Sequence, residues 1–461
     1  MKQRLFVGLW ATAFVVAACG GGNSSAAPSA GGEGASPSAG GGGASPSADG
    51  GGASASAGAG GTDLAGTTIT VGGAFVDKEA AAFEAAFNPF EDATGADVVY
   101  NGDKSFEQNL NVQVQAGNPP DVALLPQPGG MKNYASQGKL FPLPADVTAS
   151  IDANYGEGWK AIGTATDGNV YGVFHRVNLK GLVFYPKAAF EAKGYAIPTT
   201  WDELKTLQDK MATDGVAAWC IGVESGAATG WPSTDWMEEI MLRTVGKDGY
   251  DKWVNHEIPF NDPTVKNAAQ MLMDIWGNEK YVYGGPQYIV QTNFGEAPKA
   301  AFDDPPKCWF TNQGNFITSF FPEAVIADLD NQVGVFNLPA IDPQYGTPAE
   351  VGGDQAVAFN DRPEVWAFLK YLTTPEAGVS WSKTGGALFP YKDQDLANYS
   401  SKLDQAFVET LTGAEFVRFD GSDQMPSAVG SGTFWSEMVK LVVGSQDIDT
   451  TLNNIEASWP K

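Results

Sequence analysis

The chain has 461 residues, with 54 acidic against 28 basic side chains and a formal net charge of −26 at pH 7. A chain of this length is too long for one hydrophobic core, so we expect two domains once the termini are set aside. The acidic excess argues against nucleic acid and against anionic lipid surfaces as partners, because both are bound through basic patches.

The first 18 residues have the pattern of a signal peptide. Lys2 and Arg4 precede an apolar run over residues 5–18, which is too short for a stable membrane span. The run ends in VAAC at residues 16–19, which resembles the lipobox of bacterial lipoproteins. The resemblance implies cleavage before Cys19 and lipidation of the Cys19 sulfur by a thioether-linked diacylglycerol. The alternative is an ordinary signal peptide that a cysteine follows by chance.

Residues 19–62 have the composition of a flexible tether. They are almost all Gly, Ala, Ser and Pro, and GASPSA occurs at 34–39 and again at 43–48. Such a segment has nothing to bury, so we expect it to stay disordered, with a mean reach of about 35–40 Å. We therefore expect an extracytoplasmic body that an N-terminal lipid holds near a bacterial cell membrane.

Strand and helix patterns alternate at the start of the body. Apolar residues three or four apart, among them Phe83, Phe87 and Phe90, predict an amphipathic helix that ends at Gly95. Short apolar runs bounded by Gly or Pro predict strands. In chain order the patterns predict a strand over 68–71, a helix over 77–94, a strand over 98–100, a helix over 104–116 and a strand over 122–125.

This alternation predicts an α/β lobe with a largely parallel sheet. In open sheets of this kind, ligands bind beyond the carboxyl ends of the strands. The loops at 73–75, 101–103 and 127–129 are therefore candidates for a ligand site.

The stretch over 220–243, CIGVESGAATGWPSTDWMEEIMLR, places two tryptophans and a carboxylate at a loop-to-helix junction. We expect the helix to begin at Ser233 or Thr234, after a break at Trp231. An aromatic face beside a charged acceptor suits a polyhydroxylated ligand, because the ring covers C–H groups while the carboxylate accepts hydroxyl protons. The alternative interpretation is that Trp236 simply begins the core face of the helix.

Several runs together carry a family resemblance. The run GDKSFEQNLNVQVQAGNPPDVALLPQPG at 102–129 resembles the family 1 extracytoplasmic solute-binding proteins of ABC importers. The likeness continues through KGLVFYPKAAFEAKGYAIPTTWDEL at 180–204, where Thr200 and Glu203 are placed as a capping box. It extends through KCWFTNQGNFITSFFPE at 307–323, GGDQAVAFNDRPEVWAFLKYLTTPEA at 352–377 and RFDGSDQMPSAVGSGTFW at 418–435. Together these runs resemble the α-glucoside-binding branch of the family.

The resemblance implies an α/β, two-lobed periplasmic-binding-protein-like fold of type II character, with the ligand cleft between lobes joined by a multi-crossing hinge. We expect hinge crossings near 175–183, 339–351 and 374–381. The predicted first lobe comprises 63–175 and 340–374, and the predicted second lobe comprises 176–339 and 375–461.

Two cysteines remain in the body when Cys19 is assigned to lipid. Cys220 and Cys308 form an even pair in an oxidising compartment, which favours a disulfide. On the chain-entropy model, closing so long a loop stabilises the fold by about 4 kcal/mol. Reduced, buried thiols are the alternative.

The body offers few residues for catalysis. Its two histidines, His175 and His256, leave little for a His-rich zinc site or a Ser-His-Asp triad, and we interpret His175 as structural. A glycosidase stays open as an alternative, since sequence does not place two carboxyls about 5–10 Å apart on either side of a glycosidic bond. We expect no enzyme activity and no cofactor or metal, with an incidental Ca²⁺ on the acidic surface left open.

The resemblance also implies a set of cleft residues. Aromatic side chains in loops or beside Gly and Pro alternate with short carboxylates, which is a combination suited to sugar recognition. The predicted ligand-binding residues are Asp103, Gln127 and Asp354 from the first lobe, Trp231, Asp235, Trp236 and Trp309 from the second, and Trp381 and Asp423 at the rim.

The resemblance, together with these patterns, implies a monomeric binding protein that does no chemistry. Its expected ligand is a small neutral oligosaccharide, an α-glucoside such as maltose, trehalose or sucrose. Its expected partners are the permease subunits of an ABC importer. A cationic ligand such as a polyamine is the alternative within binding proteins, because an acidic, aromatic-rich cleft suits it too.

Overall fold

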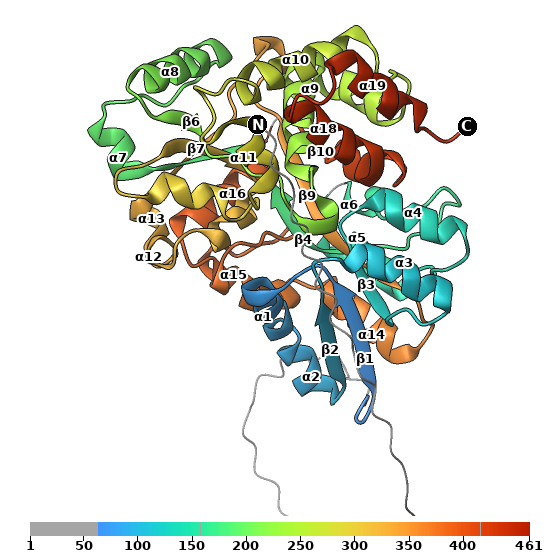
Figure 1. Ribbon diagram of the computed structural model, residues 1–461. Coiled ribbons are helices and arrows are strands. Elements are labelled where there is room, and N and C mark those ends of the chain that lie inside the picture. The colour runs from blue at the N-terminus through green and yellow to red at the C-terminus, as the bar shows by residue number, and fades with distance from the viewer. Residues whose placement is uncertain (1–62, 157, 415) are drawn as a thin grey trace, which may run out of the picture. The chain divides into compact units, whose positions relative to one another are not determined.

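Two mixed β-sheets organise the residues that the computed structural model describes, which are 63–156, 158–414 and 416–461 (Figure 1). The signal peptide predicted over 1–18, the lipidation at Cys19 and the tether predicted over 19–62 lie outside the described residues. Among the helices of the described ranges, none combines the length and the hydropathy that crossing a bilayer requires.

The first sheet has the strand order β10-β9-β3-β1-β2, and β4 also pairs with β9. Strands β1, β2 and β3 are parallel, as the sequence predicts, whereas β9 runs antiparallel to both β3 and β4. The strands are β1 (Thr68–Gly73), β2 (Asp97–Gly102), β3 (Val122–Leu125), β4 (Val173–Leu179), β9 (Ala349–Ala358) and β10 (Val417–Phe419).

Helices cover both faces of the first sheet, and strand β3 shows how. Val122 and Leu124 pack into one core, while the alternate residues Ala123 and Leu125 pack into another. This is the period-two pattern of a strand buried on both sides. The larger core receives α1 (Asp77–Ala85), α2 (Asn88–Thr94), α5 (Ala145–Asn154), α14 (Pro363–Leu372) and α15 (Glu376–Thr384), and the smaller one receives α3 (Phe106–Ala116) and α4 (Pro128–Ser136).

The helix predicted over 77–94 is two helices, α1 and α2. Pro89 lies at the second position of α2, where it cannot donate to a preceding turn, so the chain restarts a helix there instead of continuing one. Phe83, Phe87 and Phe90 are all buried, so the predicted apolar face is confirmed despite the break.

The second sheet has the order β6-β7-β5-β8. Cys220 directly follows β6 and Cys308 begins β7, and the two form a disulfide with Cα atoms 5.5 Å apart. The predicted disulfide is confirmed, and it ties together neighbouring parallel strands. The strands are β5 (Leu182–Pro186), β6 (Ala217–Trp219), β7 (Cys308–Gln313) and β8 (Val333–Asn337).

Helices of the second sheet enclose a core rich in tryptophan. Trp219, Trp236, Trp253 and Trp276 are all fully buried there. The predicted capping box of Thr200 and Glu203 begins α8. The helices that contribute to this core are α7 (Lys187–Ala192), α8 (Trp201–Thr213), α9 (Trp231–Val254), α10 (Pro263–Trp276), α11 (Gly285–Gln291), α18 (Trp435–Val442) and α19 (Ile448–Ala457).

Helix α9 begins at Trp231, two residues before the predicted start. Pro232 lies at the second helical position, where a missing N–H costs no hydrogen bond, so the proline opens the helix rather than preceding it. Gly230 precedes it with φ 116°, and a Cβ on Gly230 would lie 2.5 Å from the Trp435 carbonyl oxygen. Only glycine fits this junction.

Short elements complete the described chain. The remaining α-helices are α6 (Trp159–Ile162), α12 (Glu323–Ile326), α13 (Leu329–Gln332), α16 (Lys402–Gly413) and α17 (Gly421–Gln424). The 3₁₀ segments are η1 (Gly226–Ala228), η2 (Ala297–Phe302), η3 (Asn315–Phe320), η4 (Pro343–Tyr345) and η5 (Leu396–Asn398), and η6 (Val429–Phe434) is a π-helix.

The chain passes between the sheets at Lys180–Gly181, after β4, and again over 338–348, between β8 and β9. Strand β10 lies in the first sheet, beside β9. The predicted lobe boundaries stay a prediction.

His175 lies in the core of the first sheet, with 1% of its surface exposed. Its ring centroid is 5.4 Å from that of Phe83 and 5.6 Å from that of Phe389. Burial, reinforced by the neighbouring Arg176 guanidinium, lowers the pKa of His175 to about 3.

The buried His175 should make the fold less stable in mild acid. The unfolded histidine takes up a proton near pH 6.5 and the folded one near pH 3, so the unfolded state binds more protons between these values and stability falls as the pH falls through that window. Relative to His175→Phe, the natural protein should lose about 1.4 kcal/mol of unfolding free energy per pH unit below 6.5. Denaturant unfolding at pH 7, 6 and 5 measures this, and parallel pH profiles for the two proteins would contradict it.

Candidate functional site

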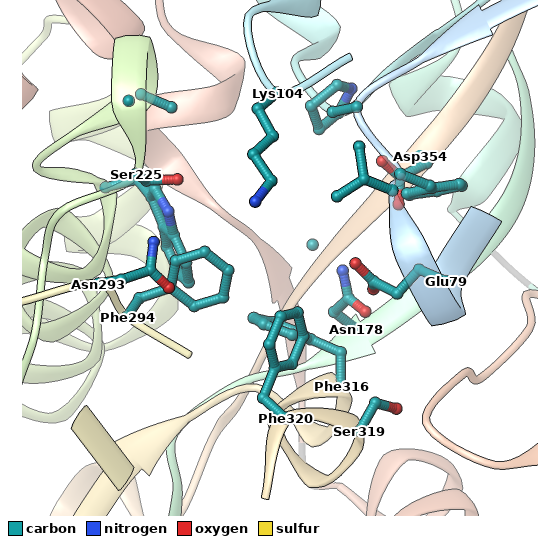
Figure 2. Close-up of a pocket in the computed structure, with 18 of the residues that line it drawn as sticks. Glu79, Lys104, Asn178, Ser225, Asn293, Phe294, Phe316, Ser319, Phe320 and Asp354 are labelled. Atoms are coloured by element: carbon teal, nitrogen blue, oxygen red, sulfur yellow. The ribbon is translucent and has the colours of Figure 1, made fainter. Parts of the chain in front are cut away.

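A cavity of about 740 Å³ lies where the carboxyl ends of β1 and β3 meet β4, β9 and the start of α9. Ala74 and Phe75 follow β1, and Pro126 and Gln127 follow β3, so two of the three predicted loops reach it. The volume is typical of a site for a small molecule. In Figure 2, Glu79 and Asp354 face Ser225 and Asn293 across the cavity, with Lys104 between them.

Strand β4 forms the cavity floor with every second residue. Arg176, Asn178 and Lys180, in the run HRVNLKG, all line the cavity. Side chains two apart on a strand point to the same face, whereas the intervening Val177 and Leu179 are buried in the core. The alternation therefore places two cations and an amide in one row.

Arg176 fixes two carboxylates at one end of the row. Its guanidinium donates to Asp354 Oδ2 at 2.8 Å and to Glu79 Oε1 at 2.6 Å. It also lies 4.3 Å from the ring centroid of Phe75 and 5.5 Å from that of Trp381. Burial alone would lower the pKa of Arg176, but the two carboxylates raise it, so the guanidinium stays charged and holds both acids in place.

Lys180 holds a second set of acids at the other end. Its ammonium bonds to Asp235 Oδ1 at 2.9 Å and to Asp420, and lies 3.9 Å from Glu350 Oε1. Burial opposes the charge on Lys180, yet these carboxylates raise its pKa well above the usual range. Burial raises the pKa of Asp235 to about 7 and raises the pKa of Glu350 and Asp423 well above the usual range of a carboxyl group.

Asp235, Glu350 and Asp420 have oxygens close enough together to hold a metal ion. The Lys180 ammonium, however, bonds to two of these three acids and already supplies the positive charge that such an ion would bring. We therefore interpret Asp235 and Asp420 as the counterions of Lys180.

Aromatic rings form a wall beside this floor. The Trp231 ring meets Phe294 edge-on at 5.1 Å and lies 5.9 Å from Phe316, measured between centroids. Lys180 Nζ lies 5.9 Å from the Trp231 centroid. Trp231 is only half-buried because it occupies the first position of α9, at the cavity edge. The ring can therefore stack on a ligand.

Glu224 lies on the wall opposite β4 and is held by two donors. Asn293 Nδ2 donates to its Oε2 at 2.9 Å, and the Gly226 backbone N–H donates to its Oε1 at 2.7 Å. The Asn293 bond, followed by the Gly226 bond, lowers the pKa of Glu224, and Lys104 adds to the effect. The cavity thus combines fixed charges of both signs with aromatic surface.

The structure brings four of the nine predicted ligand residues together. Gln127, Trp231, Asp354 and Asp423 line the cavity. Asp235 lies behind the lining and contacts it through Lys180.

The other four predicted ligand residues are placed elsewhere. Asp103 accepts a hydrogen bond from the Ser105 backbone N–H at 2.9 Å, at the start of α3. Trp236 and Trp309 belong to the core of the second sheet and Trp381 to that of the first, each at most 2% exposed. None of these four is part of the cavity lining.

Sequence reasoning missed the row on β4, together with Glu79 and Asp420, which bind its two cations. A signal for the row exists, because the polar residues at 176, 178 and 180 alternate with the apolar Val177 and Leu179. That pattern marks a strand with one polar face. Glu79 and Asp420 carry no local signal, since they are brought to β4 only by the fold.

Comparison with known sequences places the chain among binding proteins. The family model for bacterial extracellular solute-binding proteins matches residues 76–379. The osmoprotective compounds-binding protein GgtB of Synechocystis sp. is 42% identical over 395 residues, which cover 85% of this chain and 92% of that protein. The alpha-glucosides-binding periplasmic protein AglE of Rhizobium meliloti is 38% identical over 405 residues, which cover 86% of this chain and 88% of that protein.

Comparison with solved structures concerns the fold. The bacterial solute receptor AcbH, described as exclusively preferring β-D-galactopyranose, matches with a TM-score of 0.73 at 22% identity, covering 85% of this chain and 98% of that one. Likeness at this identity shows the architecture alone. It confirms the predicted two-lobed α/β fold.

Proposed function

The chain belongs to the family of bacterial extracellular solute-binding proteins, and on that premise we propose that it captures a small uncharged oligosaccharide for an ABC importer. The ligand class we propose is an α-glucoside such as maltose, trehalose or sucrose. The observation that carries the proposal is that one cavity is lined both by the Trp231 ring and by the fixed carboxylate of Asp354. Such a ring stacks on the C–H face of a sugar, while the carboxylate accepts hydroxyl protons.

The cavity charges favour a neutral ligand over a polyamine. Asp354 and Glu79 are already paired with Arg176, and Asp420 with Lys180. A polyamine would therefore meet two cations on the floor, whereas sugar hydroxyls can donate to the acids and accept from the bases at the same time. This argument supports a sugar among the alternatives that the acidic composition leaves open.

The mechanism we propose is a shift between conformations. The cavity is lined by β4 and β9 of the first sheet on one side and by the start of α9, a helix that packs into the core of the second sheet, on the other. The chain crosses between the two sheets beside the cavity at Lys180–Gly181. A ligand that contacts both sides stabilises the closed form, and that form docks on the permease. No bond in the sugar is made or broken, so the protein is not an enzyme in this proposal.

A thermal-shift panel tests the ligand class. Maltose, trehalose and sucrose are compared with putrescine, spermidine and glycine betaine, the last being a small quaternary ammonium solute. We expect at least one disaccharide to raise the melting temperature and the three cationic or zwitterionic compounds to leave it unchanged, because only the sugar matches the paired charges. A response to the amines or to betaine alone would overturn the sugar proposal. Recovery of intact disaccharide after incubation separates binding from glycosidase activity.

Trp231→Ala should weaken binding of the responding sugar by about 10- to 100-fold, because it removes the stacking surface from the cavity. Titration calorimetry measures the affinity. Trp366→Ala is the matched control, since Trp366 is a half-buried tryptophan on α14 outside the cavity lining. Equal affinity of both variants would remove Trp231 from the site.

For the N-terminus we propose lipidation of Cys19, which would tether the monomeric binding body to the membrane. The support is the VAAC sequence and the Gly/Ala/Ser/Pro-rich segment that follows it. We expect Cys19→Ala to move the full-length protein from the membrane fraction to the soluble fraction of bacterial cells, with its sugar response unchanged. Membrane retention of the variant would contradict the anchor.

A further inference from the structure

The floor of the cavity contains an asparagine set between two ion pairs. In the antiparallel ladder of β4 and β9, Arg176 lies opposite Asp354 and Asn178 lies opposite Gly352. The next pair, Lys180 and Glu350, is joined by a backbone hydrogen bond of 2.9 Å. Charged pairs therefore flank the Asn178–Gly352 pair on both sides.

The Asn178 amide is buried without a hydrogen-bond partner. The residue is 8% exposed and lines the cavity, and its Oδ1 is shielded from solvent with no partner among the described residues. No hydrogen bond from its Nδ2 to those residues is present either. The Nδ2 group is therefore free to donate to a ligand in the cavity, and a ligand that accepts this bond would pair an amide that the described residues leave unpaired. Figure 2 shows Asn178 beside Glu79, on the Asp354 side of the cavity.

Gly352 keeps the position opposite Asn178 open. Because glycine has no side chain, nothing from β9 covers the amide at its own ladder position. A Cβ added to Gly352 would lie 3.1 Å from Cε of Lys180 and would narrow the floor at this point. The space that Gly352 leaves open beside Asn178 therefore lies between Arg176 and Lys180, which their acids hold in place.

Asp354 supplies the complementary acceptor. It bonds to Arg176 through Oδ2, and its Oδ1 has no hydrogen-bond partner among the residues described. Asp354 and Asn178 are diagonal neighbours in the ladder, a relation in which backbones are about 7–8 Å apart and side chains can converge on one group. A hydroxyl both accepts and donates, so it can satisfy the amide N–H and the carboxylate together.

We propose that Asn178, with Gly352 opposite it, forms a subsite that recognises one specific hydroxyl of the bound sugar. The subsite rests on the proposed function, and it names the residue that discriminates between sugars in that same cleft. A sugar that lacks this hydroxyl leaves the amide unpaired in the closed cleft and is rejected. Arg176 and Lys180 set the limits of the subsite by holding their acids on either side.

The test compares Asn178→Ala and Asn178→Leu with the natural protein, using the disaccharide that gives the largest thermal shift. Both variants should bind it about 10- to 100-fold more weakly in titration calorimetry, because a buried hydrogen bond to the hydroxyl is lost. Their melting temperatures without sugar should not fall, because the amide has no protein partner to lose. The leucine variant has as many side-chain heavy atoms as asparagine and leaves no cavity, whereas the alanine variant adds no bulk, so neither a cavity nor steric exclusion explains a result that both variants share.

Asn312→Ala is the matched control. Asn312 is also 8% exposed with a buried, unpartnered Oδ1, but it lies on β7 and outside the cavity lining. Its variant should bind the sugar as the natural protein does. Gly352→Ala should weaken binding in the same direction as the Asn178 variants.

Monodeoxy analogues of the same sugar complete the test. One analogue should bind the natural protein about tenfold or more weakly, and the Asn178 variants should no longer distinguish it from the parent sugar. Undiminished binding of the parent sugar by both Asn178 variants overturns the subsite while leaving the proposed function intact. If no sugar binds the natural protein, the proposed function and the subsite fail together.

Discussion

The pairing of β4 with β9 is the constraint on which the binding cavity depends. This ladder sets Arg176 opposite Asp354, and beyond it Lys180 beside Glu350, at the point where the chain leaves the first sheet for the second. A shift of the register by one residue would turn the row of polar side chains into the apolar core. The buried charges oppose such a shift, because an unpaired ion in the core is far more costly than a paired one. The floor is therefore specified by electrostatics as much as by packing.

The paired charges also reconcile the acidic composition of the protein with the neutral ligand that we propose. Its net charge is −26, yet acids of the cavity floor are matched with the guanidinium of Arg176 and the ammonium of Lys180. What such a floor presents is a set of oriented dipoles and hydrogen-bonding atoms rather than a field of one sign. Beside it, Trp231 adds aromatic surface. The net charge of the whole chain would favour a cationic ligand, whereas the paired charges of the cavity favour the proposed neutral one. We give more weight to the cavity, because only its residues contact the ligand.

Sequence patterns predicted those features that depend on neighbours along the chain. Strand β3 has the predicted bounds, Gly117 ends α3 in the left-handed conformation, and Thr200 caps α8 as expected. Patterns left open whether Trp236 is a core residue or a ligand residue, because both Trp231 and Trp236 belong to α9 and only the packing of distant segments decides which ring faces the cavity. The same limit applies to Arg176, whose partner Asp354 is 178 residues away in sequence. Sequence patterns therefore predict features that depend on neighbouring residues, such as helix caps, but not which distant residues form pairs in the folded protein.

The long distance along the sequence between paired residues such as Arg176 and Asp354 also affects the rate of folding. Contacts between segments so distant in sequence form only after a large loss of chain entropy, so a site built on them assembles slowly. During synthesis β4 is complete long before β9 exists, so Arg176 lacks Asp354 and Lys180 lacks Glu350 until β9 is made. Binding competence is therefore a late event in the folding of this chain. It follows the pairing of β9, from the last third of the chain, with β4, from the first half.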